Sequence, residues 1–338
     1  MAQADPPPLR SAGGSLWVST GHLPTEEVVR LLVNEAHRRF SPVKEGEVAR
    51  YIPALALANP DHFGVCVAAT GGQLFEAGET NQPFSIQSLS KPFLFALICE
   101  AIGERQAREK LGVNRTGLPF NSVLAVERTE EGLSNPMVNA GAIAATSLAP
   151  GDSMEAKWAF IQEGFSRFAD RPLVIDEAVH ASELANNRRN VGIANLLEEQ
   201  ERIWMDPEAA TELYTRQCAL SVTARDLALM AATLANGGRH PRSGEQVIEP
   251  LLCQHVLAVM VTAGLYETSG DWLYDIGLPG KSGVSGGMIT VAPGKGGLAT
   301  YSPPLDDSGN SVRGQLTAAF LSERLGLNLF ASRPARRG

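Results

Sequence analysis

The stretch FSIQSLSKPFLFALICEAIG, residues 84–103, places a serine and a lysine just before a long apolar run. Pro92 has no backbone N–H and is tolerated only in the first turn of a helix, so a helix is expected to begin within about one turn before it. Ser88 then lies at or near the N-cap and Lys91 lies in the first turn. The i, i+3 spacing puts both side chains on one face of the helix.

This pair has the composition of an acyl-transfer nucleophile and its base. The partial positive charge at a helix N-terminus stabilises a developing alkoxide and makes a lysine less basic. A neutral lysine amine can then take the proton of a serine hydroxyl, which is a poor nucleophile without help. Serine is also an ordinary N-cap residue, and Ser41 and Lys44 in SPVK have the same spacing. The spacing of Ser88 and Lys91 alone therefore leaves a purely structural role open.

A second motif, Lys281-Ser282-Gly283, follows about 190 residues downstream of Lys91. Serine acylases of the penicillin-binding type carry a K-[ST]-G on a strand that lines the nucleophile, and an S-x-N or Y-x-N between the two motifs. The third motif is missing between the other two here, because Ser308-Gly309-Asn310 follows the KSG. The motifs predict a related fold and nucleophile without penicillin chemistry. A plain turn remains the alternative for KSG, since Lys295-Gly296-Gly297 is a similar tripeptide.

Composition and charge limit the class of protein. The chain has 338 residues, of which 44% are hydrophobic and 20% charged, and its net charge is −8. These values are typical of a globular protein and argue against an electrostatic nucleic-acid binder. No apolar run reaches the ~20 residues of a membrane helix, and the N-terminus lacks the pattern of a signal peptide. We therefore expect a soluble, cytoplasmic protein with neither nucleic acid nor membrane as a partner.

Cysteine and histidine patterns give no sign of a disulfide framework or a metal site. The four cysteines are far apart inside apolar segments, and no CxxC, HxH or HxxxH occurs. We expect reduced core cysteines, no metal and no cofactor, since GxGxxG and Walker patterns are also missing. The cysteines are Cys66, Cys99, Cys218 and Cys253.

The order of expected elements predicts an α+β fold. Residues 24–40 have helical periodicity, and residues 63–79 read as two strands joined by a Gly-Gly turn. Residues 88–236 are largely helical. Within them, SVTARDLALMAATLANGG is a helix that Ser221 or Thr223 can cap at its start and Gly237 at its end. After residue 270, glycine-rich alternating sequence predicts two or three antiparallel strands with a turn around 293–297.

Strands at both ends of the chain flank this helical middle. The prediction is an antiparallel sheet flanked by helices with an inserted helical lobe, of the β-lactamase and penicillin-binding-protein type, with a cleft between sheet and lobe. We expect one catalytic domain over 23–325, after a flexible leader (1–22) and before a basic tail (326–338). Its sheet part covers about 23–87 and 238–325, and its helical lobe about 88–237.

Seven sequence blocks occur together and in a characteristic order. They are YIPALA (51–56), IQSLSK (86–91), NPMVNAGAI (135–143), SELANNRRNVGIA (182–194), LYTRQCALSVTARDLALMAATLANGG (213–238), GLYETSGDW (264–272) and GLPGKSGVSGGM (277–288). With these blocks the sequence resembles the serine-dependent glutaminases, a β-lactamase-like family that hydrolyses L-glutamine to glutamate and ammonia. The resemblance extends from about residue 23 to about 325. It implies the fold predicted above and an assembly into dimers or tetramers.

The resemblance also implies roles for individual residues. Ser88 would be the nucleophile, Lys91 its base, and Tyr266 a proton donor to ammonia or an activator of the deacylating water. Glu183 would pair with the substrate ammonium, which needs a charged or strongly polar partner when buried. The backbone N–H groups of Ser88 and Val284 would hold the oxyanion. The implied substrate contacts are Tyr51, Ser88, Asn139, Glu183, Asn190, Tyr214, Tyr266 and Val284, among which Asn139, Asn190, Tyr51 and Tyr214 can donate to the substrate carboxylate.

Other classes make different predictions. A β-lactamase, D,D-peptidase or esterase of the SxxK type is expected to be exported and to carry S-x-N or Y-x-N in order. A cysteine-type amidotransferase needs a reactive cysteine near a histidine. A non-catalytic binding protein on the same scaffold is expected to lose Ser88 or Lys91, and both are present.

Overall fold

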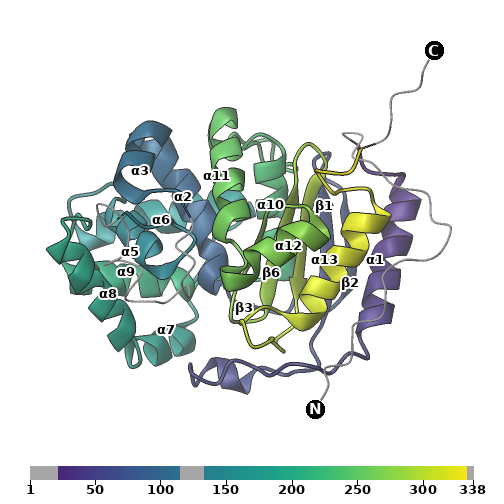
Figure 1. The fold of residues 1–338 in the computed structure, drawn as a ribbon, viewed down its shortest axis with the longest axis horizontal. Helices are drawn as coiled ribbons and strands as arrows, with labels where there is room; N and C mark the ends of the chain where they lie inside the picture. Colours follow the sequence, from purple (N-terminus) through teal and green to yellow (C-terminus); the bar gives the residue numbers. More distant parts are fainter. Residues whose placement is uncertain (1–21, 115–132, 333–338) are drawn as a thin grey trace.

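A computed structural model of the chain describes residues 22–114 and 133–332 (Figure 1). The predicted leader, apart from residue 22, and the last six residues of the predicted tail lie outside the described residues. Residues 326–332 are described, and Leu327 among them is buried against the core.

The central sheet has five antiparallel strands in the order β2-β1-β7-β6-β5. β1 is bonded to β2 on one side and to β7 on the other, with Val67 opposite Leu298 in the second pair. Segments from both ends of the chain therefore form one sheet, which confirms the α+β prediction. The strands are β1 (Gly64–Ala69), β2 (Leu74–Gly78), β5 (Gly280–Ser282), β6 (Gly287–Ala292) and β7 (Gly296–Tyr301).

Alternate residues of the strands face two separate apolar layers. Cys66 and Ala299 belong to the core layer that contains α10 (Ala224–Ala235), whereas Val67 and Leu298 belong to the layer that contains α1 (Glu26–Phe40). This is the period-2 burial expected of a sheet covered on both faces. α13 (Val312–Arg324) lies beside α1 in the second layer, and α12 (Ser269–Ile276) lies on the other side of α13, as Figure 1 shows.

α10 lies directly on the sheet. A Cβ built on Gly297 would be 2.5 Å from the backbone of Ala228 and Ala232, so the strand needs glycine where the helix approaches. Thr223, one of the two predicted caps, begins α10 through a capping box with Asp226. Asn236 is the C-cap, and the predicted Gly237 follows it with a positive φ. The range expected for the helical lobe, about 88–237, therefore includes a helix that packs on the sheet.

The other helices gather to one side of the sheet (Figure 1). α2 (Ser90–Ile102) is buried along most of its length and packs against α5, α6 and α11, because its sequence is apolar all round. The remaining helices there are α3 (Glu104–Leu111), α5 (Asn139–Ser147), α6 (Met154–Ala169), α7 (Glu177–Leu184), α8 (Arg188–Glu199), α9 (Pro207–Cys218) and α11 (Pro250–Ala263).

The four cysteines are buried and unpaired, as expected of core thiols. Among the helices of the described residues, none by itself has the length and apolar character to cross a bilayer; α11 together with Tyr266–Ile276 meets the criterion only as a pair bent by 104°.

A short second sheet, β3 (Phe84–Ser85) with β4 (Ser221–Val222), was not expected from the sequence. Two-residue strands are too short to show a periodicity. This ribbon ties the chain just before Ser88 to the start of α10, and the Ile86 N–H extends it by donating to the Leu220 carbonyl at 2.8 Å.

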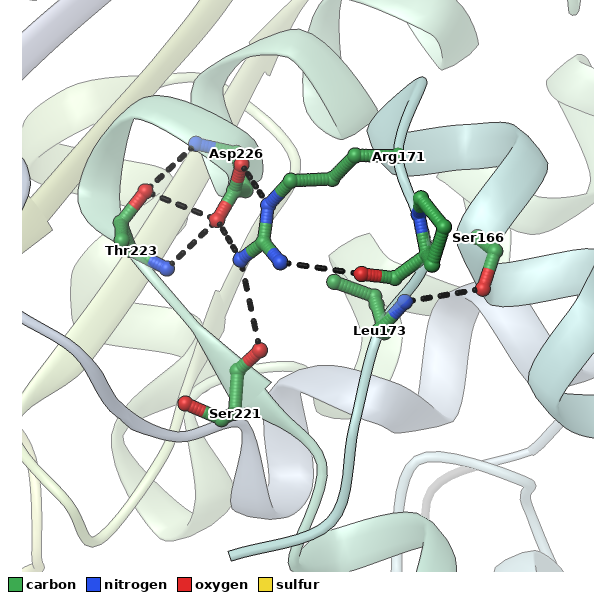
Figure 2. Close-up of polar contacts among 7 residues, drawn as sticks. Ser166, Arg171, Leu173, Ser221, Thr223 and Asp226 are labelled. Atoms are coloured by element: carbon green, nitrogen blue, oxygen red, sulfur yellow. Dashed lines mark hydrogen bonds and ion pairs between the residues drawn. The ribbon is translucent and has the colours of Figure 1, made fainter.

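An ion pair fastens this ribbon to α6 (Figure 2). Arg171, just beyond the end of α6, donates from Nε and Nη2 to the two carboxylate oxygens of Asp226 at 2.9 and 2.6 Å. The same Nη2 reaches the Ser221 carbonyl at 3.5 Å. One Asp226 oxygen also accepts from the Thr223 N–H at 2.9 Å, so a single carboxylate both caps α10 and binds the arginine.

We predict that Asp226→Ala lowers the free energy of unfolding by about 1–3 kcal/mol, because it removes the cap and leaves a half-buried arginine without its partner. Asp226→Asn keeps an oxygen for the cap and is expected to cost about 1 kcal/mol. Urea unfolding of the two variants measures both values. Equal losses for Ala and Asn would show that capping by Asp226 contributes nothing.

Candidate active site

Ser88 lies in a 3-10 turn, η2 (Gln87–Leu89), that runs directly into α2. The N-cap residue of α2 is Leu89, so Ser88 precedes the N-cap by one residue instead of occupying it. Ser88 is 7% exposed and lines a cavity. The residue before it, Gln87, has φ = +51°. The turn thus presents the serine hydroxyl to the cavity.

Lys91 is the second residue of α2 and is only 1% exposed. Its Nζ donates to Asn139 Oδ1 at 2.7 Å. Burial lowers the pKa of Lys91 to about 7, because an apolar surrounding disfavours the charged form. Near neutral pH a large share of this amine is therefore unprotonated and able to accept a proton.

The cavity beside Ser88 has a volume of about 310 Å³ and an opening to solvent. Seven of the eight residues expected to contact substrate line it, from six separate segments of the chain. Tyr51, 61% exposed, lies at its edge, and Val284, 6% exposed, follows β5. The seven are Tyr51, Ser88, Asn139, Glu183, Asn190, Tyr214 and Val284; the eighth, Tyr266, and the expected base Lys91 are not among the lining residues that the structure describes.

Three polar residues on α5, α8 and α9 form one network. Asn139 Nδ2 donates to Asn190 Oδ1 at 3.1 Å, and the Tyr214 hydroxyl approaches Asn139 Oδ1 at 3.4 Å. Since Oδ1 also accepts from Lys91, the Asn139 amide has a fixed orientation. Asn139 is the first residue of α5 and Val138 is its N-cap, so Asn139 does not act as the cap residue.

Glu183, near the end of α7, is the carboxylate in the cavity wall. Gln87 Nε2 donates to its Oε1 at 2.5 Å. Burial raises the pKa of Glu183 to about 7, and the hydrogen bond from Gln87 acts in the opposite direction. An incoming cation would therefore find a carboxylate that is desolvated and held in place.

Tyr266 begins a second 3-10 turn, η4 (Tyr266–Thr268), on the sheet side of the site and has φ = +56°. Its hydroxyl donates to the Ser282 carbonyl at 3.1 Å and shares a side-chain hydrogen bond with Ser88. Burial raises the pKa of Tyr266 to about 12, against the effect of these two bonds. Its hydroxyl is therefore protonated at neutral pH and adjoins the serine.

The KSG motif lies at the end of β5, next to Tyr266. Lys281 is fully buried, donates to the carbonyls of Gly264 and Ser282 at 3.0 and 2.8 Å, and lies 4.3 Å from the centroid of the Tyr266 ring. A Cβ on Gly283 would be 3.1 Å from Leu89 Cγ, so the chain after β5 packs closely on the turn that carries Ser88.

Two contributors were missed by the sequence analysis. Gln87 lines the cavity and bonds Glu183, and its only signal was its place before Ser88. Asn310, the last residue of the misplaced S-x-N triplet, accepts from Ser282 Oγ at 2.6 Å and so does reach the KSG strand. Among the described residues, no group of three or more His, Cys, Asp or Glu side chains could hold a metal ion. A serine, a buried amine, a tyrosine hydroxyl and a carboxylate together suit acyl transfer on a small cationic substrate.

Comparisons with known proteins agree in pointing to one family. The family model described as glutaminase matches residues 46–330. Glutaminase 2 of Yersinia pestis is 57% identical over 94% of both chains, and the glutaminase of Colwellia psychrerythraea is 44% identical over 91% of this chain and 99% of its own.

Solved structures give the same result for the fold. A structure described as probable glutaminase ybaS has a TM-score of 0.90 at 38% identity, over 91% of this chain and all of its own. A probable glutaminase from Bacillus subtilis, complexed with 6-diazo-5-oxo-L-norleucine, has a TM-score of 0.82 at 30% identity, over 91% of this chain and 99% of its own. These are glutaminases of the β-lactamase-like fold, which confirms the predicted fold class.

The lowered pKa of Lys91 makes a prediction about stability. Between about pH 7 and the ordinary lysine pKa of ~10.4, the unfolded chain holds a proton on Lys91 that the folded chain has released, so stability rises with pH there. Lys91→Met has no proton to release on folding, so it should have a larger free energy of unfolding than wild type at pH 7. Its advantage should shrink by about 1 kcal/mol per pH unit up to pH 9.

Urea unfolding at pH 7, 8 and 9 measures this difference. Lys44→Met, at an exposed lysine that pairs with Asp61, is the control for the loss of a lysine outside the cavity. A Lys91→Met advantage that stays constant over this range would mean that Lys91 is protonated in the folded protein.

Proposed function

Because the chain belongs to the glutaminase family and is a glutaminase, we propose that it hydrolyses L-glutamine through an acyl-serine intermediate, with Ser88 as nucleophile and Lys91 as its base. The observation that carries this proposal is the buried amine of Lys91, three residues from a serine that lines the cavity. A pKa of about 7 is suited to a general base at neutral pH.

Acylation would start with neutral Lys91 taking the Ser88 hydroxyl proton. Ser88 Oγ attacks the carbon of the substrate's side-chain amide, and the oxygen becomes an oxyanion. The N–H groups of Ser88 and Val284 are proposed to stabilise it, at about 3 kcal/mol per donor in comparable enzymes. The C–N bond then breaks, and the leaving nitrogen takes a proton to depart as ammonia. Tyr266, whose hydroxyl adjoins Ser88, is the proposed donor.

Deacylation reverses the roles with water as the nucleophile. Water loses a proton to the Tyr266 phenolate, which acylation left after the transfer to ammonia, and attacks the acyl carbon; the Ser88 oxygen leaves and regains its proton from the Lys91 ammonium. The products are glutamate and ammonia. The buried hydroxyl of Tyr266 and the amine of Lys91 are the two groups proposed to move protons in this step.

Substrate recognition would use the opposite charges of a free amino acid. Glu183 is proposed to bind the α-ammonium, while Asn139, Asn190, Tyr214 and Tyr51 donate to the α-carboxylate. Two solved relatives support an amino-acid ligand: Mglu in its glutamate form, and the Bacillus subtilis protein with 6-diazo-5-oxo-L-norleucine.

Three further properties stay predictions: assembly into a homodimer or homotetramer, a cytoplasmic location, and the division into a sheet part and a helical lobe.

Ser88→Ala is expected to abolish ammonia release from glutamine while the protein still folds, because no other hydroxyl is proposed to attack the amide. Lys91→Ala should be nearly as severe and should not respond to added salt, since its role is proton transfer. Coupled ammonia assays and thermal unfolding measure both effects. Activity of Ser88→Ala within tenfold of wild type would remove Ser88 from this role, and turnover of nitrocefin by wild type would favour a β-lactamase instead.

Glu183→Gln keeps the size of the side chain but removes the charge that offsets a desolvated cation. We expect kcat/KM for glutamine to fall roughly 30-fold or more, as for a broken buried ion pair. N-acetylglutamine lacks the cation and should be a very poor substrate for wild type, and the variant should discriminate less against it. Equal discrimination between glutamine and N-acetylglutamine by both proteins would show that Glu183 does not bind the ammonium.

A further inference from the structure

Gln87 lies directly before the nucleophile, yet the mechanism above gives it no task. It is 4% exposed and is one of four non-glycine residues with positive φ among those that the structure describes. A left-handed backbone costs an L-residue energy and persists only where the surroundings hold it. Two contacts of the Gln87 side chain help to hold this backbone conformation.

The amide of Gln87 links the β3–β4 ribbon to the carboxylate of Glu183. Nε2 donates to Glu183 Oε1 at 2.5 Å and to Ser85 Oγ at 3.2 Å. Ser85 pairs with Ser221 in the β3–β4 ribbon, which the Arg171–Asp226 ion pair fastens in place (Figure 2). Gln87 is thus anchored at Ser85 in the β3–β4 ribbon, and from there it reaches the Glu183 carboxylate on α7.

We propose that Gln87 is a positioning residue for substrate specificity, whose amide holds the Glu183 carboxylate, in its charged form, where it meets the α-ammonium. This inference rests on the proposed function, because it requires Glu183 to bind that ammonium. It adds a residue that touches no reacting atom to the set that selects a free amino acid.

The charge state of Glu183 provides the physical argument. Burial favours the protonated acid, whereas an N–H that donates to a carboxylate favours the ionised form, and here the balance leaves the pKa at about 7. Loss of a hydrogen bond to a charged group is expected to raise that pKa by about one unit or more. At pH 7 the ionised share would then fall from about one half to about one tenth.

Other titratable groups around the carboxylate do not mask this effect. Burial raises the pKa of Cys218 to about 12 and that of Tyr214 well above its ordinary value, so both stay neutral near pH 7. The Tyr51 phenol and the Arg189 guanidinium also line the cavity. Lys91, whose pKa burial lowers to about 7, titrates in the same range and contributes to the acid limb of wild type and variants alike. All of them are unchanged in a Gln87 variant, so a difference between proteins reports the lost amide.

The experiment uses Gln87→Leu, which removes the amide but keeps bulk, and Gln87→Gly, which removes the amide and relaxes the positive φ. We expect both to raise KM for glutamine about fivefold or more at pH 7 and to move the acid limb of kcat/KM up by about one pH unit. At pH 9, where Glu183 is ionised in all proteins, the difference in KM should largely disappear. A merely structural loss would not recover in this way.

Gln217→Leu is the matched control. Gln217 is also a buried glutamine near the nucleophile, but its Nε2 donates to Ser90 Oγ at 2.8 Å and it does not line the cavity. For Gln217→Leu, the acid limb of kcat/KM should lie at the same pH as in wild type. Calorimetric binding of L-glutamate across the same pH range repeats the test without a chemical step.

The outcomes separate this inference from the proposed function. If Glu183→Gln reduces discrimination but neither Gln87 variant moves the acid limb, Gln87 has no such role and the proposed function stands. A shift in Gln87→Leu but not in Gln87→Gly would trace the effect to strain and would also overturn the inference. If Glu183→Gln has no effect on discrimination, both fall together.

Discussion

The amine of Lys91 is buried at the start of an apolar helix, and the cost of desolvating an ammonium there governs what surrounds it. One acceptor of this amine is the amide oxygen of Asn139. An amide satisfies an N–H of the amine without the full charge of a carboxylate, which would raise the pKa and keep the proton on the lysine. Asn190 and Tyr214 then fix that amide from α8 and α9. Polar residues from three helices are thus arranged around one buried amine.

The sheet side of the site meets a different requirement. Tyr266 must bring a hydroxyl to Ser88 while its own backbone is in the left-handed region. Lys281 contributes to this arrangement, because it binds the Gly264 carbonyl two residues before Tyr266 and the Ser282 carbonyl that also accepts from the Tyr266 hydroxyl. The helical side therefore supplies a buried amine, and the sheet side supplies a hydroxyl held by neighbouring backbone.

Local chemistry made much of the fold predictable, and long-range contacts account for what was missed. The capping residue of α10 and the Gly-Gly turn between β1 and β2 depend on residues close in sequence, and both agree with the structure. The one-residue offset of Ser88 from the N-cap comes from a 3-10 turn that no spacing announces. The Gln87–Glu183 bond joins residues 96 positions apart, so only the folded chain reveals it. Individual roles at the site followed from seven blocks in order, since each residue alone also had an ordinary structural interpretation.

The pairing of β1 with β7 has a consequence for how the chain is made. Val67 pairs with Leu298, which the ribosome adds 231 residues later. At ~5–20 residues per second this interval lasts about 12 to 46 s. Throughout it the apolar strand β1 has only β2 as a strand partner, and an unpaired edge of this kind can join another chain. A nascent chain is therefore most exposed to aggregation before β7 has left the ribosome, and slower initiation or chaperone binding to the first strands should improve its yield.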